Sequence, residues 1–251
     1  MASPWQNVWI TGASSGICRQ VAEDLARQGC NVYISARRQD VLEDIAAPSE
    51  RLFPVPVDVG GPDQISKAVS QILSQCGSLD LVLLGAAVWH PMTLDEWDRE
   101  KINRSMAINH SGVINCISPV LPGMIERQKG HIGILSSVAG YRGLPRSLAY
   151  GPTKAALINL SETLYPELRK HNIDLSIINP GFVDTPMTRV NEFPMPWIMS
   201  VDKASQIIIR GLQKQKFEIA FPWQMVWLLK FSKLLPYPLF FWFIRTFMKT
   251  A

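Results

Sequence analysis

The feature that most constrains the fold of this chain is a regular alternation of short apolar segments with longer segments of helical periodicity. The apolar segments predict strands within residues 7–11, 31–36, 51–59, 79–87, 131–137, 173–181 and 217–221. Helical spacing predicts helices within 15–29, 39–47, 63–77, 99–128, 149–171 and 201–214. Strands that alternate with such helices form βαβ units, and near-continuous apolar strands are buried on both faces. The alternation therefore predicts an α/β fold, a Rossmann-like doubly wound parallel sheet of about seven strands with helices on both faces.

Composition narrows the classes of protein to which the chain can belong. No repeat or linker interrupts the alternation, so we predict a single domain over residues 1–221. None of the four cysteines forms a CxxC pair, which predicts free thiols, and the histidines show no metal-ligand spacing, so no metal is expected. The net charge of +4 is not clustered in the body of the chain, so no nucleic-acid partner is expected. The first residues lack a signal-peptide pattern, which predicts a cytoplasmic location.

Residues 222–251 form a tail of different composition. The tail has no acidic residue; its basic residues are Lys230, Lys233, Arg245 and Lys249, and its tryptophans are Trp223, Trp227 and Trp242. Its longest uncharged piece, 234–244, is too short and too proline-broken to cross a bilayer. Basic and aromatic residues on short helices favour a membrane surface, which would place the protein at the inner face of a membrane. A dimer contact and a flap over the active site are the alternatives.

A glycine-containing turn joins the first predicted strand to the first predicted helix, in the sequence ITGASSGIC. Glycine lets the backbone bend tightly and approach a pyrophosphate, and the free N–H groups at the helix start hold the anion. An ordinary βα turn is the alternative, but a turn that opens the first βαβ unit has the position that a dinucleotide site requires. The predicted contacts are Gly12, Ser14, Ser15, Gly16 and Ile17.

The end of the second predicted strand indicates which dinucleotide is preferred. An acidic residue there would bind the ribose 2′-hydroxyl of NAD, but the sequence has Ala36 followed by Arg37 and Arg38. A guanidinium group suits a 2′-phosphate. Two solvated arginines in a loop are the alternative. We predict NADP(H) in preference to NAD(H).

Tyr150 and Lys154 are four residues apart in a predicted helix, so they share one helix face. A phenol has a pKa of about 10, and a nearby ammonium group lowers it by stabilising the phenolate. Tyr150 can then exchange a proton with a substrate oxygen. Ser137 ends the fifth predicted strand, at the edge where doubly wound sheets bind ligands, and its hydroxyl can hydrogen-bond the same oxygen.

Together these residues resemble the short-chain dehydrogenase/reductase family, in its NADP-preferring form, over residues 5–221. The glycine motif of the family matches TGASSGIC, its catalytic serine matches Ser137 in LSSVAG, and its catalytic Tyr-xxx-Lys matches Tyr150 and Lys154. The resemblance implies that Asn109, in MAINHSG, orders a proton relay behind Lys154. The further cofactor contacts that it implies are Asp58, Val59, Ala86, Tyr150, Lys154, Pro180, Gly181, Val183 and Thr185.

Two motifs depart from the family pattern. The third glycine of the glycine motif is Cys18, and the usual Asn-Asn-Ala-Gly after the fourth strand is Leu84, Gly85, Ala86 and Ala87. We expect the cysteine to change the packing of the first helix against its strand. We also expect the sheet to be braced differently where the asparagines are missing. Neither departure removes a catalytic group.

The resemblance implies reversible hydride transfer between a nicotinamide and a carbonyl or alcohol carbon, with reduction favoured when the cofactor is NADPH. It places a substrate lid over 185–200, whose methionines and aromatic residues favour a small lipophilic carbonyl substrate, unless they pack only on the lid itself. Further candidates for the pocket wall are Trp89, His90, Tyr141 and Leu144. A non-catalytic NADP(H)-binding sensor or scaffold, and a β-ketoacyl carrier-protein reductase, are the alternative functions. Members of the family often pair through their long helices, so a homodimer or homotetramer is expected.

Overall fold

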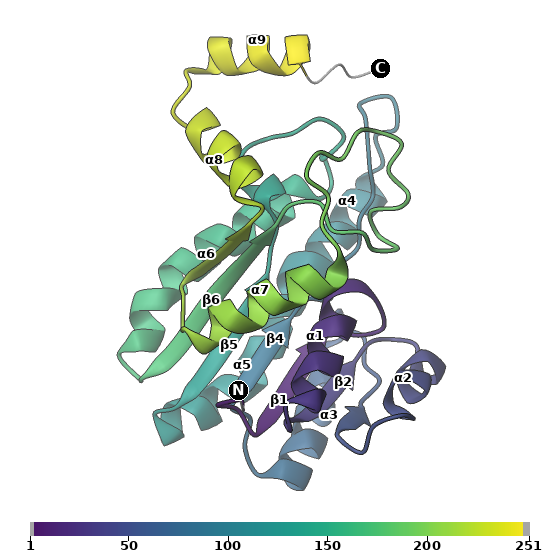
Figure 1. Cartoon of the computed structure of the whole chain (residues 1–251), viewed down its shortest axis with the longest axis vertical. Coiled ribbons are helices and arrows are strands. Elements are labelled where there is room, and N and C mark those ends of the chain that lie inside the picture. The colour runs from purple at the N-terminus through teal and green to yellow at the C-terminus, as the bar shows by residue number, and fades with distance from the viewer. Residues whose placement is uncertain (1–2, 248–251) are drawn as a thin grey trace.

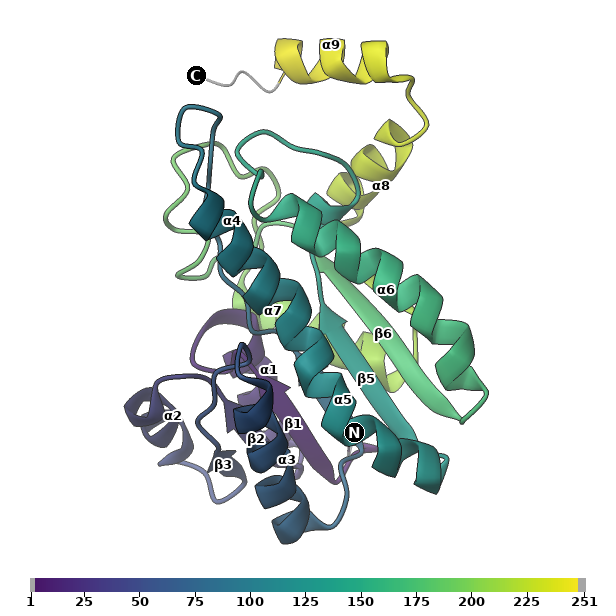
Figure 2. The same ribbon diagram turned by 180° about the vertical axis from the view of Figure 1, so that it is seen from behind.

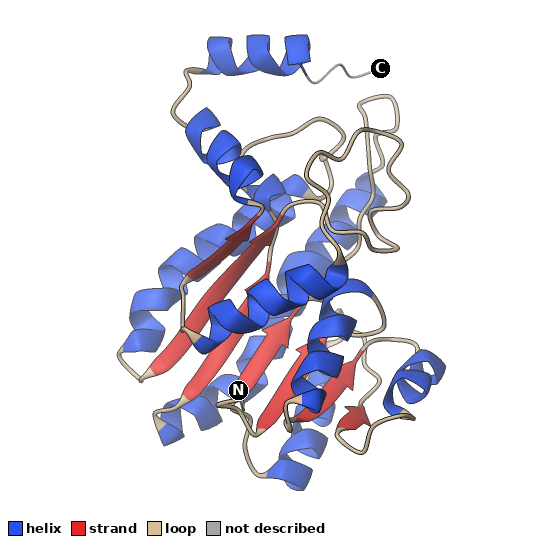
Figure 3. Ribbon diagram, in the orientation of Figure 1, coloured by secondary structure: helices blue, strands red, loops and turns tan. Residues whose placement is uncertain are grey.

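A single parallel sheet of seven strands forms the centre of the molecule, in a computed structural model that describes residues 3–247. The strand order is β3-β2-β1-β4-β5-β6-β7, and every neighbouring pair is parallel. The first strand lies inside the sheet and the order reverses beside it, which is the doubly wound arrangement. Helices cover both faces (Figure 1, Figure 3). The predicted Rossmann-like α/β fold is confirmed.

The elements follow the predicted order. The strands are β1 (Asn7–Thr11), β2 (Asn31–Ser35), β3 (Leu52–Pro54), β4 (Leu81–Leu84), β5 (Gly130–Leu135), β6 (Ile173–Pro180) and β7 (Glu218–Phe221). The helices are α1 (Gly16–Arg27), α2 (Gln39–Ala46), α3 (Pro62–Cys76), α4 (Arg99–Met106), α5 (Gly112–Arg127), α6 (Gly151–Arg169), α7 (Val201–Gln213), α8 (Trp223–Ser232) and α9 (Tyr237–Phe247).

Two apolar cores lie on the two faces of the sheet. Alternate residues of one strand point to opposite faces, so Trp9 of β1 belongs to one core while Val8 and Ile10 belong to the other. Helices α3, α5 and α6 cover the first face, as Figure 2 shows from behind, and α1 and α7 cover the second. This burial on both faces is why the strands have near-continuous apolar sequences.

The long helix predicted over 99–128 is interrupted. Helix α4 ends at Met106, a π-turn follows over Ala107–Ser111, and α5 begins at Gly112. A π-turn admits one extra residue per turn and is common at functional sites. Periodicity averaged over the segment cannot reveal one wider turn, so the sequence analysis missed the interruption. The π-turn contains Asn109, one of the predicted site residues.

Because all strands are parallel, the segments that follow them leave from the same edge of the sheet. These segments are residues 85–98 after β4, 136–150 after β5, 181–200 after β6 and 222–247 after β7. Helices α8 and α9 extend beyond this edge, at the top of Figure 1, and the predicted lid lies nearby. Within residues 3–247, none of the helices is both long enough and apolar enough to cross a bilayer.

The two departures from the family pattern meet in space. A methyl group added at Gly85 would overlap the Sγ atom of Cys18, and it would also lie 3.1 Å from a methyl carbon of Leu135. Cys18 is buried on α1, so its thiol fills the space that a side chain at position 85 would need. The glycine missing from position 18 is therefore matched by a glycine at position 85, and the helix still packs closely on the sheet.

This pairing predicts that the cost of a side chain at position 85 depends on residue 18. We expect Gly85→Ala to lower the free energy of unfolding by about 1–3 kcal/mol through overpacking, and by clearly less in a Cys18→Ala background. Chemical denaturation of the four proteins of this cycle measures the coupling. Gly143→Ala is the control, because a methyl group there meets nothing within 4 Å. Equal costs in both backgrounds would show that the thiol does not occupy this space.

Candidate active site

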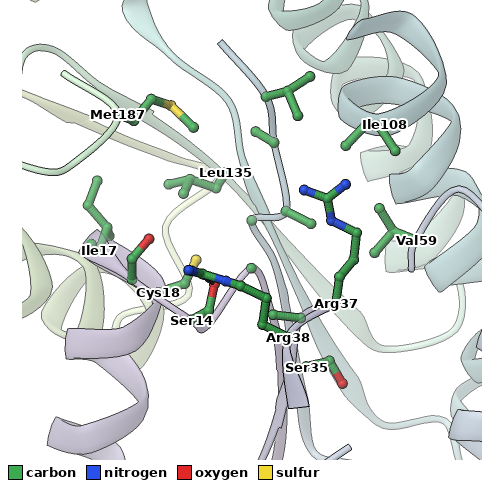
Figure 4. A pocket seen from close by; sticks show the side chains of 18 of the residues that line it. Ser14, Ile17, Cys18, Ser35, Arg37, Arg38, Val59, Ile108, Leu135 and Met187 are labelled. Atoms are coloured by element: carbon green, nitrogen blue, oxygen red, sulfur yellow. Dashed lines mark hydrogen bonds between the residues drawn. The ribbon is translucent and has the colours of Figure 1, made fainter. Parts of the chain in front are cut away.

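A cleft of about 280 Å³ opens at the carboxyl edge of the sheet, between the segments that follow β1, β2 and β4. Most of the predicted cofactor residues line this cleft, and Figure 4 shows several of them. They are Gly12, Ser14, Ser15, Gly16, Ile17, Arg37, Arg38, Asp58, Val59, Ala86 and Thr185. The edge that the strand order selects is therefore also the edge where the sequence motifs gather.

The backbone around Gly12 and the start of α1 fit a dinucleotide phosphate. Gly12 has φ of 73°, and a methyl group on it would lie 2.7 Å from the nitrogen of Ala86, so only glycine allows this close crossing. Helix α1 begins at Gly16 after Ser15, whose side chain makes no capping bond, and its first turn has no acidic residue. The first N–H groups of a helix lack intrahelical partners and attract anions. The cleft therefore has the backbone that the predicted cofactor requires.

Two arginines give the cleft a positive end. Arg37 and Arg38 both line it, and one Nη of Arg38 lies 3.4 Å from the Ser14 hydroxyl oxygen, to which it donates a hydrogen bond. Figure 4 shows the Arg38 side chain reaching toward Ser14 and the Arg37 side chain extending toward Val59 and Ile108. Asp58 is the only acidic residue in the lining of this cleft in the described part of the chain. Both side chains therefore place positive charge in the lining of the cleft.

Ser137 and Tyr150 meet beside the end of β5. Ser137 follows the strand and opens a 3₁₀ turn at Val138–Gly140, where its Oγ accepts a hydrogen bond from the Ala139 nitrogen at 3.1 Å. The same hydroxyl donates to the carbonyl oxygen of Pro180 at 3.3 Å, and it is close enough to the Tyr150 phenol to lower the pKa of that group. Tyr150 precedes the first residue of α6. The predicted serine and tyrosine are therefore in contact.

Lys154 is buried, with 2% of its surface exposed, one turn into α6. Its Nζ donates a hydrogen bond to the carbonyl oxygen of Leu135 at 2.8 Å and lies 5.3 Å from the centroid of the Tyr150 ring. Burial lowers the pKa of Lys154 from 10.5 to about 8. The ammonium group is thus fixed below the aromatic ring by a backbone carbonyl at the end of β5.

The pKa of Tyr150 moves in the direction opposite to our expectation. Burial raises the pKa of the phenol above its ordinary value, and the hydrogen bond from Ser137 only partly offsets this rise. Lys154 does not contribute to this shift: the Leu135 carbonyl holds its ammonium group over the Tyr150 ring, 5.3 Å from the ring centroid. The phenol of this structure is therefore a protonated group at neutral pH.

Asn109 joins two parts of the site instead of contacting Lys154. Its Oδ1 accepts a hydrogen bond from the Val88 nitrogen at 2.7 Å, and its Nδ2 donates to the Val88 carbonyl at 3.0 Å. The same Nδ2 donates to the Thr153 hydroxyl at 3.2 Å, next to Lys154 in sequence. Asn109 therefore braces the segment after β4, where the family asparagines are missing, against α6.

Five predicted cofactor residues do not line the cleft, and three of them lie at or just after the end of β6. Pro180 ends β6 and holds Ser137 through its carbonyl oxygen. Gly181 approaches the tail, because a methyl group there would lie 2.8 Å from Met225 Sδ. Val183 is buried and pairs with Met199 in an isolated bridge. Tyr150 and Lys154 likewise lie outside the cleft lining.

Trp89 is a wall residue whose contacts were not foreseen in the sequence analysis. Its ring meets the Tyr150 ring edge-on, with centroids 5.0 Å apart, and its Nε1 donates to Asn191 Oδ1 of the lid at 2.9 Å. Trp89 does not line the cleft itself, whereas Ile108, Leu135 and Val88 do and were missed in the sequence analysis. Ile108 and Leu135 lie within two residues of predicted site residues in sequence, which is the only signal that pointed to them.

The other proposed wall residues have different roles. Tyr141 is buried, and its hydroxyl donates to Glu218 Oε1 at 2.6 Å, so it does not face a substrate. Leu144 packs against an apolar core. The Nε2 atom of His90 is buried without a partner among the described residues. In the lid, Met187 lines the cleft, while Phe193 packs against Phe182.

Comparison with known proteins assigns the chain to a large group of enzymes. The sequence profile of the family described as short chain dehydrogenase matches residues 6–193. An uncharacterized oxidoreductase of Myxococcus xanthus is 34% identical over 240 residues, which is 94% of this chain and 95% of that protein. The 3-oxoacyl-[acyl-carrier-protein] reductase FabG of Staphylococcus epidermidis is 32% identical over 184 residues, which is 71% of this chain and 75% of that protein.

Solved structures share the fold. A short chain dehydrogenase from Burkholderia cenocepacia in complex with NADP matches with a TM-score of 0.81 and 22% identity, over 93% of this chain and 95% of that one. A short chain dehydrogenase/reductase from Burkholderia phymatum in complex with NAD matches with a TM-score of 0.83 and 22% identity, over 91% of this chain and 92% of that one. At this level of identity the likeness concerns the fold alone.

The buried ammonium group predicts a pH-dependent difference between the wild type and Lys154→Met. Because the folded pKa of Lys154 is lowered to about 8, the cost of burying the charge is complete below that pH and vanishes as pH rises to the unfolded value of 10.5. We expect the melting temperature of the variant minus that of the wild type to fall as pH rises through this window. Lys67→Met on α3, where the lysine is exposed, is the control. A constant difference would contradict a lowered pKa for Lys154.

Proposed function

The chain belongs to the short-chain dehydrogenase/reductase family, and from this premise we propose that it reduces a lipophilic ketone or aldehyde with NADPH. As a member of this family it is an oxidoreductase that acts between alcohols and carbonyl compounds. The observation that supports the proposal most directly is the geometry at the end of β5, where Lys154 Nζ, held by the Leu135 carbonyl, lies 5.3 Å from the centroid of the Tyr150 ring, beside the turn that Ser137 opens.

The proposed chemistry assigns each of these residues one task. A bound nicotinamide supplies the hydride, or accepts it in the reverse reaction. The Tyr150 phenol donates its proton to the substrate oxygen as negative charge develops there. The Ser137 hydroxyl hydrogen-bonds the same oxygen. For Lys154 to stabilise the phenolate that remains, its ammonium group would have to turn from the Leu135 carbonyl toward the phenol oxygen. The Tyr150 phenol is protonated at neutral pH, which is the form that reduction needs.

The proposed preference for NADP(H) rests on charge at the end of β2. Arg37 and Arg38 line the cleft where an acidic residue would otherwise bind the ribose, and Ala36 takes the acidic position. Arginine presents a fork of donors that matches phosphate oxygens. Among the solved relatives, one was crystallised with NADP and another with NAD, so relatives alone do not decide between the cofactors.

The proposed substrate class follows from the surroundings of Tyr150. The Trp89 ring covers one edge of the phenol, and Met187 of the lid lines the neighbouring cleft. These groups are apolar, and a thioether adapts to ligands of irregular shape. A lipophilic carbonyl compound would therefore lose little solvation on entering, whereas a highly charged one would find no partner among them.

A carrier-protein reductase is the second candidate function. The similarity to the staphylococcal 3-oxoacyl-[acyl-carrier-protein] reductase is the observation that favours it. The proposed residues would perform the same reduction on a 3-oxoacyl thioester. A substrate panel that includes both simple lipophilic ketones and a 3-oxoacyl thioester separates the two, since a carrier-protein reductase should turn over the thioester far faster. A non-catalytic sensor would turn over neither.

Tyr150→Phe tests the proposed chemistry. We expect kcat/KM for lipophilic ketones with NADPH to fall by roughly a hundredfold or more, because the proton donor is lost while the ring remains. Absorbance of the nicotinamide follows the reaction. Tyr165→Phe, a change of the same kind on the same helix, is the control, because Tyr165 packs against Phe217 instead of the site. Equal rates in wild type and Tyr150→Phe would refute the proposed role.

Arg37→Asp tests the proposed cofactor preference. We expect the dissociation constant for NADPH to rise by roughly ten- to a hundredfold, because a charge-assisted hydrogen bond to the 2′-phosphate is replaced by repulsion. The constant for NADH should change much less, and titration of protein fluorescence measures both. Lys67→Asp makes the same change of charge at an exposed site on α3. An equal loss for the two cofactors would mean that Arg37 never meets the phosphate.

A further inference from the structure

Helix α8 is apolar on two opposite sides, but only one of them is covered. Its buried residues, Met225, Val226 and Leu229, pack on the end of the sheet. The opposite side presents Trp223, Trp227 and Phe231, spaced by four residues and each more than 60% exposed. A helix with apolar residues on all sides normally has partners on all sides. The exposed side of α8 therefore has no apolar partner among the residues that the structure describes, although its residues are apolar.

Helix α9 buries an even smaller share of its apolar residues than α8 does. Every residue from Tyr237 to Ile244 is apolar, apart from the tyrosine hydroxyl, and Phe240 is the only one of them that is buried. Large exposed residues of α9 include Tyr237, Phe241 and Trp242. In Figure 1 the helix lies beyond α8, across the long axis of the molecule and apart from the sheet. It is eleven residues long, far short of the roughly 20 that cross a bilayer.

Helices α8 and α9 are nevertheless fixed to the body of the protein. Arg142, which follows Ser137 by five residues, donates hydrogen bonds to the carbonyl oxygens of Lys233 and Leu235 between the two helices. Its guanidinium carbon lies 4.3 Å from the Phe240 ring centroid and 4.9 Å from that of Tyr237. The exposed apolar residues thus belong to an ordered surface and not to a loose end. We call the surface of Trp223, Trp227, Phe231, Leu234, Tyr237, Phe241 and Trp242 the tail face.

Large exposed apolar residues gather at one end of the molecule. Among the residues that the structure describes, all large apolar side chains that are exposed lie in segments beyond the carboxyl edge of the sheet, except Met106 and Ile114. Trp197 and Ile198 of the lid belong to this group and line a groove with Trp223. The tail face is therefore continuous with apolar residues of the lid. Its extent exceeds the scattered exposure that is usual for a soluble surface.

The charge of the tail indicates which kind of partner can bind the tail face. Residues 222–251 contain no acidic residue, while Lys233, which follows α8, and Arg245 of α9 are exposed basic residues. Lys230 pairs with Glu218, and Lys249 lies outside the described residues. A second copy of the same face would bring like charges together. An anionic lipid surface instead offers negative charge to the lysine and arginine, an apolar interior to the leucine and phenylalanine side chains, and an interface that tryptophan and tyrosine prefer.

We propose that the tail face binds the surface of an anionic lipid bilayer, with α8 and α9 lying in the headgroup region. The lid then faces the same bilayer, because Trp197 and Ile198 adjoin Trp223 across the groove. Binding does not depend on the reaction that the protein catalyses, so it can be tested apart from activity. The expected behaviour is that of a peripheral protein: bound to anionic vesicles, weakened by salt, and released when exposed aromatic residues are removed.

The first test is co-sedimentation of the full chain with vesicles of phosphatidylcholine, with and without phosphatidylglycerol. We expect strong binding only to the anionic vesicles. Trp227→Ser combined with Phe231→Ser should weaken this binding at least roughly tenfold, since both side chains lose their burial in lipid. Lys233→Gln and Arg245→Gln should each weaken it roughly fivefold. Ile114→Ser, which removes an exposed apolar residue of α5, is the matched control and should bind as the wild type does.

Fluorescence quenching in the wild type tests the same proposal without relying on the fold of the double variant. In the wild type, lipids brominated on their acyl chains should quench tryptophan fluorescence, and Trp227→Phe should lose part of that quenching. Absence of binding by the wild type, or equal binding by the double variant and the wild type, would overturn the proposal. If the double variant instead turns a dimer into a monomer in sedimentation velocity, without any vesicle binding by the wild type, the face is a contact between two copies.

Discussion

The site depends on the burial of one ammonium group between β5 and α6. Removing a charge from water is costly unless the protein supplies polar partners, and for Lys154 the Leu135 carbonyl is that partner. The same junction is tied a second time, because the Ser136 hydroxyl donates to the backbone carbonyl of Lys154 at 3.0 Å. The end of the strand therefore holds both the backbone and the side chain of this residue. Tyr150, which directly precedes α6 and lies four residues before Lys154, is positioned as a consequence.

The sequence was sufficient for the fold because the relevant information is local and periodic. Apolar runs and helical spacing identify the strands and helices, and chain direction then places the glycine turn, Arg37 and Ser137 at one edge. The spacing of Tyr150 and Lys154 likewise follows from helix geometry alone. These predictions need no knowledge of which side chains touch across the molecule.

The remaining details of the site depend on contacts between distant residues, which one sequence does not reveal. Nothing near Asn109 in the sequence indicates that its amide binds both backbone groups of Val88. The sequence also gives no sign that Cys18 fills the space beside Gly85, so the two residues looked like separate departures from the family pattern. The expectation for the pKa of Tyr150 was wrong because it considered the neighbouring ammonium group but not the burial of the phenol. Tyr141 was assigned to the pocket by its position, whereas Glu218 binds its hydroxyl.

Glu218 explains how the tail and the site share one rigid frame. Burial acts to raise the pKa of this carboxyl, but hydrogen bonds from Lys230, Tyr141 and Asn179 outweigh it, and the pKa is lowered. The carboxylate stays charged and links α8 to β6, β7 and the 3₁₀ turn after Ser137. Moving α8 would take Lys230 away and leave a half-buried carboxylate without its ion-pair partner, which is costlier than losing one exposed ion pair. The tail face therefore keeps its orientation relative to the catalytic edge, whatever surface it meets.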